Sequence, residues 1–294
     1  MRILVAEKLA ESGLDLLREA GHDVDVQLGL SPEELQGAIV GAHGVIIRSA
    51  TQITAEVIEA SDVLQVVGRA GVGLDNVDTE AATAAGVIVA NAPTSNSVSA
   101  AEHTLALLLA VARNVPQAHA ALAEGRWERS NWSGVELMDK SLGIIGLGNI
   151  GGIVATRAKA FGMRLIGHDP FVSTERASEL GVELMGLDEL VAEADFLTLH
   201  LARTPETIDL INADRLKLAK PNLRVVNVAR GGIVNEADLA EAIKEGTIAG
   251  AALDVFDSEP KTESPLFGLP QVVVTPHLGA VSYTHLTLPT TPYV

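Results

Sequence analysis

The chain has 294 residues, of which 47% are hydrophobic, and its formal net charge at pH 7 is −17. This length predicts about two domains, and this charge argues against binding to nucleic acid or to an anionic membrane surface. The sequence contains no cysteine, which excludes disulfides, zinc–thiolate sites and cysteine nucleophiles.

No segment of the sequence has the length of a membrane span. The longest apolar run, 105–112, is far shorter than the roughly 20 residues that a spanning helix needs. The N-terminal stretch MRILVAEKLA has neither the length nor the cleavage site of a signal peptide, so we expect a cytoplasmic protein. The eight histidines lack the paired spacing of metal ligands, and no metal site is predicted.

Short apolar strands alternate with helical stretches from the start of the chain. Strands are predicted at 2–6, 24–28, 44–49, 64–71 and 87–93, and helices at 11–21, 31–40, 54–60 and 76–86. Ser31 is a candidate cap for the second helix, with Pro32 at its first position. This alternation predicts βαβ units and a parallel sheet, and the continuous apolar strands favour a sheet covered on both faces.

The same alternation begins again in the second part of the chain. Residues 97–115 predict one long helix, and a looser segment at 124–134 contains both tryptophans. Further strands are predicted at 141–145, 164–169, 195–200, 224–229, 248–255 and 272–277. The predicted fold class is therefore α/β, with two doubly wound parallel-sheet domains: a flavodoxin-like domain at 1–96 and a Rossmann domain at 97–280.

The stretch GIIGLGNIGG contains the spacing Gly146-x-Gly148-x-x-Gly151. This spacing alone is common by chance, but here an apolar strand precedes it, a helix follows it, and Asp169 ends the next strand about 20 residues on. The helix N-terminus would bind a pyrophosphate, and Asp169 would accept hydrogen bonds from ribose hydroxyls and repel a 2′-phosphate. The pattern predicts NAD rather than NADP; the alternative is a tight turn that binds no ligand.

Three later strands are each followed by an ionisable side chain: Arg230, Glu259 and His277. The carboxyl ends of parallel strands meet at one edge of the sheet, the edge at which the glycine loop also lies. His277 suits proton transfer at neutral pH, and Arg230 suits binding of a carboxylate. Glu259 would orient the imidazole and favour its protonated form. Taken singly, His277 or Glu259 could instead be an ordinary loop residue, and Arg230 could cap a carbonyl.

Several stretches in order resemble one family. They are RAGVGLDNVD, NAPTSNSVSAAEH, GIIGLGNIG, HDP, VNVARGGIVNE, LDVFDSEP and TPHLGA. Together they resemble the D-isomer-specific 2-hydroxyacid dehydrogenases, most closely the members that act on 3-phosphoglycerate. The resemblance implies that 1–96 binds the substrate, that 97–280 binds NAD, and that Arg230, Glu259 and His277 form a catalytic triad.

The resemblance also implies the binding residues. Cofactor contacts would fall on Gly146, Gly148, Asn149, Ile150, Gly151, Asp169, Val228, Asp254, Gly279, Ala280 and Val72. Substrate contacts would fall on Arg48, Ser49, Arg69, Gly73 and Asn96. Arg48 and Arg69 have a physical argument of their own, because each follows an apolar strand and could bind a phosphate; the alternative is a surface arginine paired with a nearby acid.

The activity implied by the resemblance is NAD-dependent oxidation of 3-phospho-D-glycerate to 3-phosphohydroxypyruvate, the first step of serine biosynthesis. A glyoxylate or hydroxypyruvate reductase is the alternative within the family. An NAD-binding protein of the corepressor kind and an inactive truncated remnant are the alternatives outside catalysis. Relatives dimerise through the cofactor domain, so a homodimer is predicted.

The resemblance stops after Ala280. The remaining stretch, 281–294, has two prolines, four threonines and no helical period. We expect this tail to be foreign to the fold, the chain to be truncated relative to the family, and feedback by serine to be absent.

Overall fold

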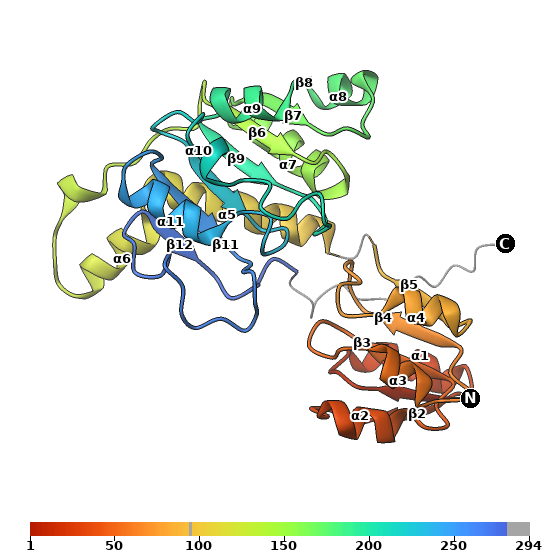
Figure 1. Ribbon diagram of the computed structural model, residues 1–294. Helices are drawn as coiled ribbons and strands as arrows, with labels where there is room; N and C mark the ends of the chain where they lie inside the picture. Colours follow the sequence, from red (N-terminus) through yellow and green to blue (C-terminus); the bar gives the residue numbers. More distant parts are fainter. Residues whose placement is uncertain (94–95, 281–294) are drawn as a thin grey trace. The chain divides into compact units, whose positions relative to one another are not determined.

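The computed structural model describes residues 1–93 and 96–280; the predicted foreign tail at 281–294 lies outside the described residues. The described chain divides into two compact units, 1–96 and 97–280 (Figure 1).

The first unit is a five-stranded parallel sheet with helices between its strands. The strands are β1 (Arg2–Val5), β2 (Asp23–Val26), β3 (Gly44–Ile47), β4 (Val66–Arg69) and β5 (Ile88–Asn91). The helices are α1 (Glu11–Glu19), α2 (Pro32–Ile39), α3 (Ala55–Glu59) and α4 (Thr79–Ala84). The strand order is β2-β1-β3-β4-β5, with parallel pairing throughout, which is the flavodoxin-like order.

Local sequence determines where the second helix of this unit begins. The Ser31 hydroxyl accepts a hydrogen bond from the backbone N–H of Glu34 (3.2 Å), and the Glu34 carboxylate accepts one from the N–H of Ser31 (2.8 Å). Pro32 occupies the first turn, where its missing N–H is not needed. The predicted cap is confirmed, and Leu35 and Ile39 on this helix pack into the core of the unit.

The second unit is a seven-stranded parallel sheet. Its strands are β6 (Ser141–Ile145), β7 (Arg164–His168), β8 (Val182–Leu184), β9 (Phe196–Leu199), β10 (Arg224–Asn227), β11 (Gly250–Leu253) and β12 (Val272–Val274). Its helices are α5 (Ser97–Arg113), α6 (Val115–Ala123), the 3-10 helix η1 (Arg129–Trp132), α7 (Asn149–Ala160), α8 (Thr174–Leu180), α9 (Leu187–Glu193), α10 (Ala213–Leu216) and α11 (Glu236–Lys244).

The strand order in the second unit is β12-β11-β10-β9-β6-β7-β8 (Figure 1). Strands β7 and β8 are added on one side of β6, and β9 to β12 are added on its other side. This is the Rossmann order with one additional strand, so the predicted α/β fold class is confirmed for both sheets. Neighbouring core residues along a strand belong to different clusters: Ile144 and Phe196 to one, Ile145 and Leu197 to the other. Both faces of the sheet are therefore covered, as the apolar strands predict.

The long helix predicted at 97–115 ends at Arg113. Asn114 takes a left-handed conformation, with φ of 52°, and α6 begins after it with Pro116 in its first turn. Within the described residues no single helix is long and apolar enough to cross a bilayer. The pair α5 and α6 has the necessary length and composition only when taken together, and the two helices are bent by 63° at their junction.

Candidate active site

Three neighbouring strands of the second unit end beside one another and carry the predicted catalytic residues. Arg230 follows β10, Glu259 lies in the loop after β11, and His277 follows β12. The strands are adjacent and parallel, with Asn227 opposite Leu253 and Leu253 opposite Val274. The three side chains are therefore presented at one edge of the sheet.

His277 and Glu259 are in direct contact. Nδ1 of His277 lies 2.5 Å from Oε2 of Glu259, and the two side chains are 40% and 32% exposed. Because a carboxylate only accepts, Nδ1 carries the proton and Nε2 of the neutral ring is the basic nitrogen. The hydrogen bond to Glu259 raises the pKa of His277 above its ordinary value, although burial of the ring opposes this.

The pKa of Glu259 is shifted in the opposite direction, below its ordinary value. Burial acts to raise its pKa, but the hydrogen bond with His277 and the backbone N–H of Phe256 (2.9 Å) outweigh burial and leave the pKa lowered. The positive charge of Arg230 adds to this lowering and also opposes the protonation of His277. The three groups thus interact electrostatically, and Glu259 stays ionised beside the imidazole.

The loop that carries Arg230 is held by its own strand end. The side chain of Asn227, 1% exposed, donates to the carbonyl of Arg230 (2.9 Å) and accepts from the N–H of Ala229 (3.0 Å). A Cβ at Gly231 would lie 1.6 Å from the carbonyl oxygen of Phe256. Only glycine therefore lets the Arg230 loop approach the backbone that leads to Glu259.

Glu236, at the start of α11, ties down the loop around Glu259. It is 8% exposed, and its carboxylate accepts from the N–H of Asp257 (2.8 Å) and pairs with Lys261 (3.0 Å).

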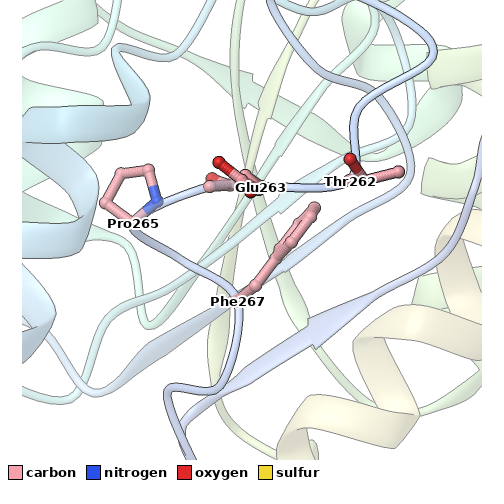
Figure 2. A pocket seen from close by; sticks show the side chains of 5 residues that line it. Thr262, Glu263, Pro265 and Phe267 are labelled. Carbon is pink, nitrogen blue, oxygen red and sulfur yellow. The ribbon is translucent and has the colours of Figure 1, made fainter.

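Farther along the same loop lies a shallow pocket (Figure 2), which is lined by Thr262, Glu263, Ser264, Pro265 and Phe267. This lining contains one carboxylate and no cationic side chain. We assign this pocket no role.

The glycine loop joins β6 to α7. Gly146 has a φ of 91°, and a Cβ there would lie 2.5 Å from the carbonyl oxygen of His200, so the turn requires glycine. A Cβ at Gly151 would lie 2.0 Å from the carbonyl oxygen of Gly146. Gly148 is the N-cap residue of α7, and a Cβ there would have nothing within 4 Å, so space is open beside the helix N-terminus.

The first turn of α7 contains no acidic side chain, and Gly148 supplies no capping side chain. Its backbone N–H groups can therefore receive an anion. Asn149 and Ile150 are the first two residues of this helix. The loop and the helix together have the form of a pyrophosphate site.

Asp169 follows β7, the strand next to β6. One carboxylate oxygen accepts from the N–H of Leu147 in the glycine loop (2.8 Å), and the other accepts from the N–H of Phe171 (2.9 Å). The carboxylate is thereby fixed beside the loop, where an acid suits ribose hydroxyls and disfavours a 2′-phosphate.

The remaining predicted cofactor residues of this unit lie near the triad. Val228 directly follows β10, and Asp254 directly follows β11. Gly279 and Ala280 come shortly after His277, and a Cβ at Gly279 would lie 2.8 Å from a side-chain carbon of Val228. Both oxygens of Asp254 bind the loop after β12, through the N–H groups of Leu278 (2.7 Å) and Gly279 (2.8 Å).

In the first unit, Arg48 and Arg69 are neighbours at the carboxyl edge of the sheet. Arg69 is the last residue of β4 and pairs in register with Ile47, which Arg48 follows. The Glu7 carboxylate, from the end of β1, accepts from the N–H groups of Arg48 (2.8 Å) and Thr51 (2.9 Å). The backbone that presents Arg48 is therefore held by a side chain from the adjacent strand.

The other predicted residues of the first unit lie on loops at the same edge. Ser49 is exposed in the loop after β3, and Val72 and Gly73 lie in the loop after β4. The carbonyl of Val72 accepts from the side chain of Asn91 (2.7 Å). Asn96 follows β5, and its Oδ1 is buried with no hydrogen-bond partner among the described residues.

Sequence reasoning missed the residues that hold these loops: Glu7, Asn227 and Glu236. Each is a polar side chain that binds backbone N–H groups or carbonyls: Asn227 those of the loop after its own strand, Glu7 and Glu236 those of another loop. No cluster of three or more histidine, aspartate or glutamate side chains suited to a metal ion occurs in the described ranges.

Comparisons with known proteins identify relatives of this chain. A model of the D-isomer specific 2-hydroxyacid dehydrogenase NAD binding domain matches residues 105–279. D-3-phosphoglycerate dehydrogenase of Mycobacterium bovis is 53% identical over 280 residues, which are 95% of this chain and 52% of that protein. The chain spans about half the length of the curated relatives it matches.

Solved structures match almost the whole chain. The TT0316 protein from Thermus thermophilus matches with a TM-score of 0.89 and 40% identity over 96% of this chain and 90% of that one. NAD-dependent formate dehydrogenase from Staphylococcus aureus, solved in complex with NAD, matches with a TM-score of 0.84 and 31% identity over 96% and 89% of the two chains.

Proposed function

The chain belongs to the D-isomer specific 2-hydroxyacid dehydrogenase family, and on that premise we propose that it oxidises 3-phospho-D-glycerate to 3-phosphohydroxypyruvate. The observation that carries the proposal is the contact between His277 and Glu259 at the edge where Arg230 also lies. The identity of about half its residues to D-3-phosphoglycerate dehydrogenases supports this substrate.

Each member of the triad has a role in the proposed reaction. His277 accepts the hydroxyl proton at Nε2, the nitrogen that Glu259 does not contact. Glu259 holds the ring by Nδ1 and stabilises the imidazolium that forms. Arg230 binds the substrate carboxylate through its planar guanidinium.

The residues of the second unit fit NAD. Open space at Gly148, a helix N-terminus without an acidic first turn and the carboxylate of Asp169 match a pyrophosphate and a ribose. NAD⁺, when bound, supplies the hydride acceptor. Within this unit, we propose contacts from the glycine loop, Asn149 and Ile150, from Asp169, and from the strand-end residues Val228, Asp254, Gly279 and Ala280.

The phosphate of the substrate is assigned to the first unit. Arg48 and Arg69 are adjacent cations at one sheet edge of a chain with net charge −17, and Ser49 and Gly73 lie on the loops beside them. We propose that Asn96 also contacts the substrate, because its side-chain amide N–H can donate to a substrate oxygen.

The direct test is formation of NADH by the purified chain with 3-phosphoglycerate at alkaline pH, with a trap for the keto product. Turnover supports the proposal. Turnover with glyoxylate or hydroxypyruvate and none with 3-phosphoglycerate would favour the alternative reductase. Binding of NADH without turnover of any of these acids would favour a cofactor-binding protein or an inactive remnant.

Replacing Arg48 with Ala tests the phosphate assignment. We expect kcat/KM for 3-phosphoglycerate to fall by about tenfold or more, because a hydrogen bond to a charged group contributes about 1.5–3 kcal/mol. Reduction of glyoxylate, which has no phosphate, should hardly change. Arg18→Ala is a matched control, since Arg18 is an exposed arginine of the same unit that pairs with Glu11 and Asp15. Equal losses for both substrates would contradict the assignment.

Replacing Glu259 with Gln tests the tuning of the base. The hydrogen bond to Glu259 raises the pKa of His277, so this pKa should fall toward its ordinary value in the variant. Oxidation needs the neutral imidazole, so the rise of kcat/KM with pH should move to lower pH, and its maximum should fall by about tenfold or more. A pH profile with an unmoved rising limb would show that Glu259 does not tune His277.

We also propose that two copies associate through the NAD-binding domain. Val115, Leu122 and Trp127 are 55%, 56% and 81% exposed on and just after α6, a grouping of apolar side chains that favours an interface. Sedimentation of the wild type and of Trp127→Glu would check this, and a wild-type monomer would refute it.

A cytoplasmic location stays a prediction, which fractionation of cells would check.

A further inference from the structure

The loop that carries His277 is held by a buried carboxylate. Asp254 is 0% exposed, and its carboxylate accepts hydrogen bonds from the N–H groups of Leu278 (2.7 Å) and Gly279 (2.8 Å) and from the hydroxyl of Thr275 (2.5 Å). A buried carboxylate needs such donors, because leaving it without them costs much free energy. The loop after β12 therefore supplies most of what stabilises this charge.

Asp254 also binds His277 itself. Its backbone carbonyl accepts the N–H of His277 (2.8 Å), so Asp254 contacts the loop at residues 275, 277, 278 and 279. His277 has a φ of 53°, in the left-handed region that is unfavourable for most side chains. A residue keeps such a conformation only where its surroundings hold it. Here those surroundings are largely the bonds from Asp254.

The fourth partner of the carboxylate comes from a distant part of the chain. His103 lies in α5, which packs against β10, β11 and β12 (Figure 1). Its Nε2 lies 3.2 Å from Oδ1 of Asp254 and 3.0 Å from the hydroxyl oxygen of Thr275. The His103 side chain is 19% exposed, so water competes little for these contacts.

The network determines which nitrogen of His103 carries a proton. The Asp254 carboxylate can only accept, and the one hydroxyl proton of Thr275 is directed to Oδ1 of Asp254 at 2.5 Å. Both groups that face Nε2 are therefore acceptors toward it. Nε2 must be the N–H of His103, and its hydrogen bond is shared between the two oxygens.

We propose that His103 is a positioning residue for the catalytic base: its Nε2–H holds Asp254 and Thr275, which in turn hold the 275–279 loop and thereby place His277 against Glu259. His103 touches neither His277 nor, in this proposal, the substrate. The effect of His103 on catalysis rests on the proposed function, whereas the effect of His103 on the geometry of His277 does not.

The proposal makes different predictions for two substitutions. In His103→Leu the donor is lost and the 275–279 loop loosens, so the hydrogen bond from His277 to Glu259, which raises the pKa of His277, weakens. In His103→Gln the amide Nε2 can reach the same place and donate to the same oxygens. The leucine variant should therefore lose the positioning, and the glutamine variant should largely keep it.

The first readout uses the chain without cofactor or substrate. The pKa of the His277 imidazole, followed by NMR in histidine-labelled protein, should fall toward its ordinary value in His103→Leu and stay close to that of the wild type in His103→Gln. This measurement stands even if no hydroxy acid is turned over, so a failure of the proposed function is distinguishable from a failure of this inference.

The second readout is kinetic. With 3-phosphoglycerate, kcat should fall about tenfold to hundredfold in His103→Leu, the size expected for one hydrogen bond to a charged group, with KM changed by no more than about twofold. His103→Gln should recover kcat to within about threefold. Thr104→Val is the matched control: Thr104 is the next residue of α5, is fully buried and binds its own helix, so it should lower stability and leave kcat unchanged.

Thr275→Val removes the second oxygen that faces Nε2. If His103 acts through Thr275 and Asp254, combining Thr275→Val with His103→Leu should lower kcat and the pKa of His277 little more than the larger single effect. Thr275→Val alone also keeps the test usable if His103→Leu does not fold. The comparison is then between Thr275→Val, which should lower kcat and the pKa of His277, and His103→Gln, which should not. A folded His103→Leu with an unchanged His277 pKa overturns the proposal, and so does a loss of kcat that His103→Gln does not recover.

Discussion

Replacing His277 with Asn is expected to lower kcat for oxidation of 3-phosphoglycerate by about 10²- to 10⁴-fold, the range that positioned proton transfer contributes. His277 is the proposed base, and the amide of Asn cannot accept a proton at neutral pH. Asn is preferred to Ala as the replacement because His277 has a φ of 53°, and Asn adopts the left-handed conformation more readily. The backbone of the loop should then survive the substitution.

The same variant should bind NADH as the wild type does. The glycine loop and Asp169 follow β6 and β7, whereas His277 follows β12 at the far end of the sheet order. Fluorescence titration with NADH and steady-state kinetics measure the two properties separately. A variant that keeps kcat within about tenfold of the wild type would show that another group accepts the proton. A variant that loses NADH binding would show that the effect is not on the chemistry alone.

The arrangement of the candidate site was readable from the sequence because of one topological rule. Arg230, Glu259 and His277 each follow an apolar strand, and the carboxyl ends of parallel strands meet at one edge. The rule needs only that the strands be parallel, which the alternation of strands and helices predicts. The contact of Glu259 with Nδ1 of His277 then follows from the adjacency of β11 and β12.

The residues that hold the loops could not be predicted in the same way. Asn227 and Glu236 bind backbone groups, which every residue supplies, so their partners leave no pattern in the sequence. His103 binds Asp254 across 151 positions of the chain, and periodicity describes only neighbours in one element. The conformation of His277 is also a product of these long-range bonds. Such residues can be identified only from the three-dimensional structure, although the parallel strands indicate the sheet edge near which they lie.

Replacing Gly151 with Ala is the second large effect that we expect. A Cβ at Gly151 would lie 2.0 Å from the carbonyl oxygen of Gly146, and no rotamer change can relieve a clash between two backbone segments. The turn between β6 and α7 must open. We expect the free energy of unfolding to fall by about 3 kcal/mol, the upper part of the range for overpacked sites. Affinity for NADH should fall by about tenfold to hundredfold, because the displaced turn carries the N–H groups proposed to bind the pyrophosphate.

Gly152 provides the matched control one residue further along α7. A Cβ there would lie 3.7 Å from Leu180, an ordinary contact, so Ala fits without movement. Because Ala loses less backbone entropy than Gly on folding, Gly152→Ala should leave stability unchanged or raise it by about 0.4–1 kcal/mol. Urea denaturation and NADH titration of both variants would test the contrast. Equal behaviour of the two would mean that the close approach of Gly151 to Gly146 does not determine the shape of the cofactor loop. A selective loss in Gly151→Ala would tie cofactor affinity to that single backbone contact.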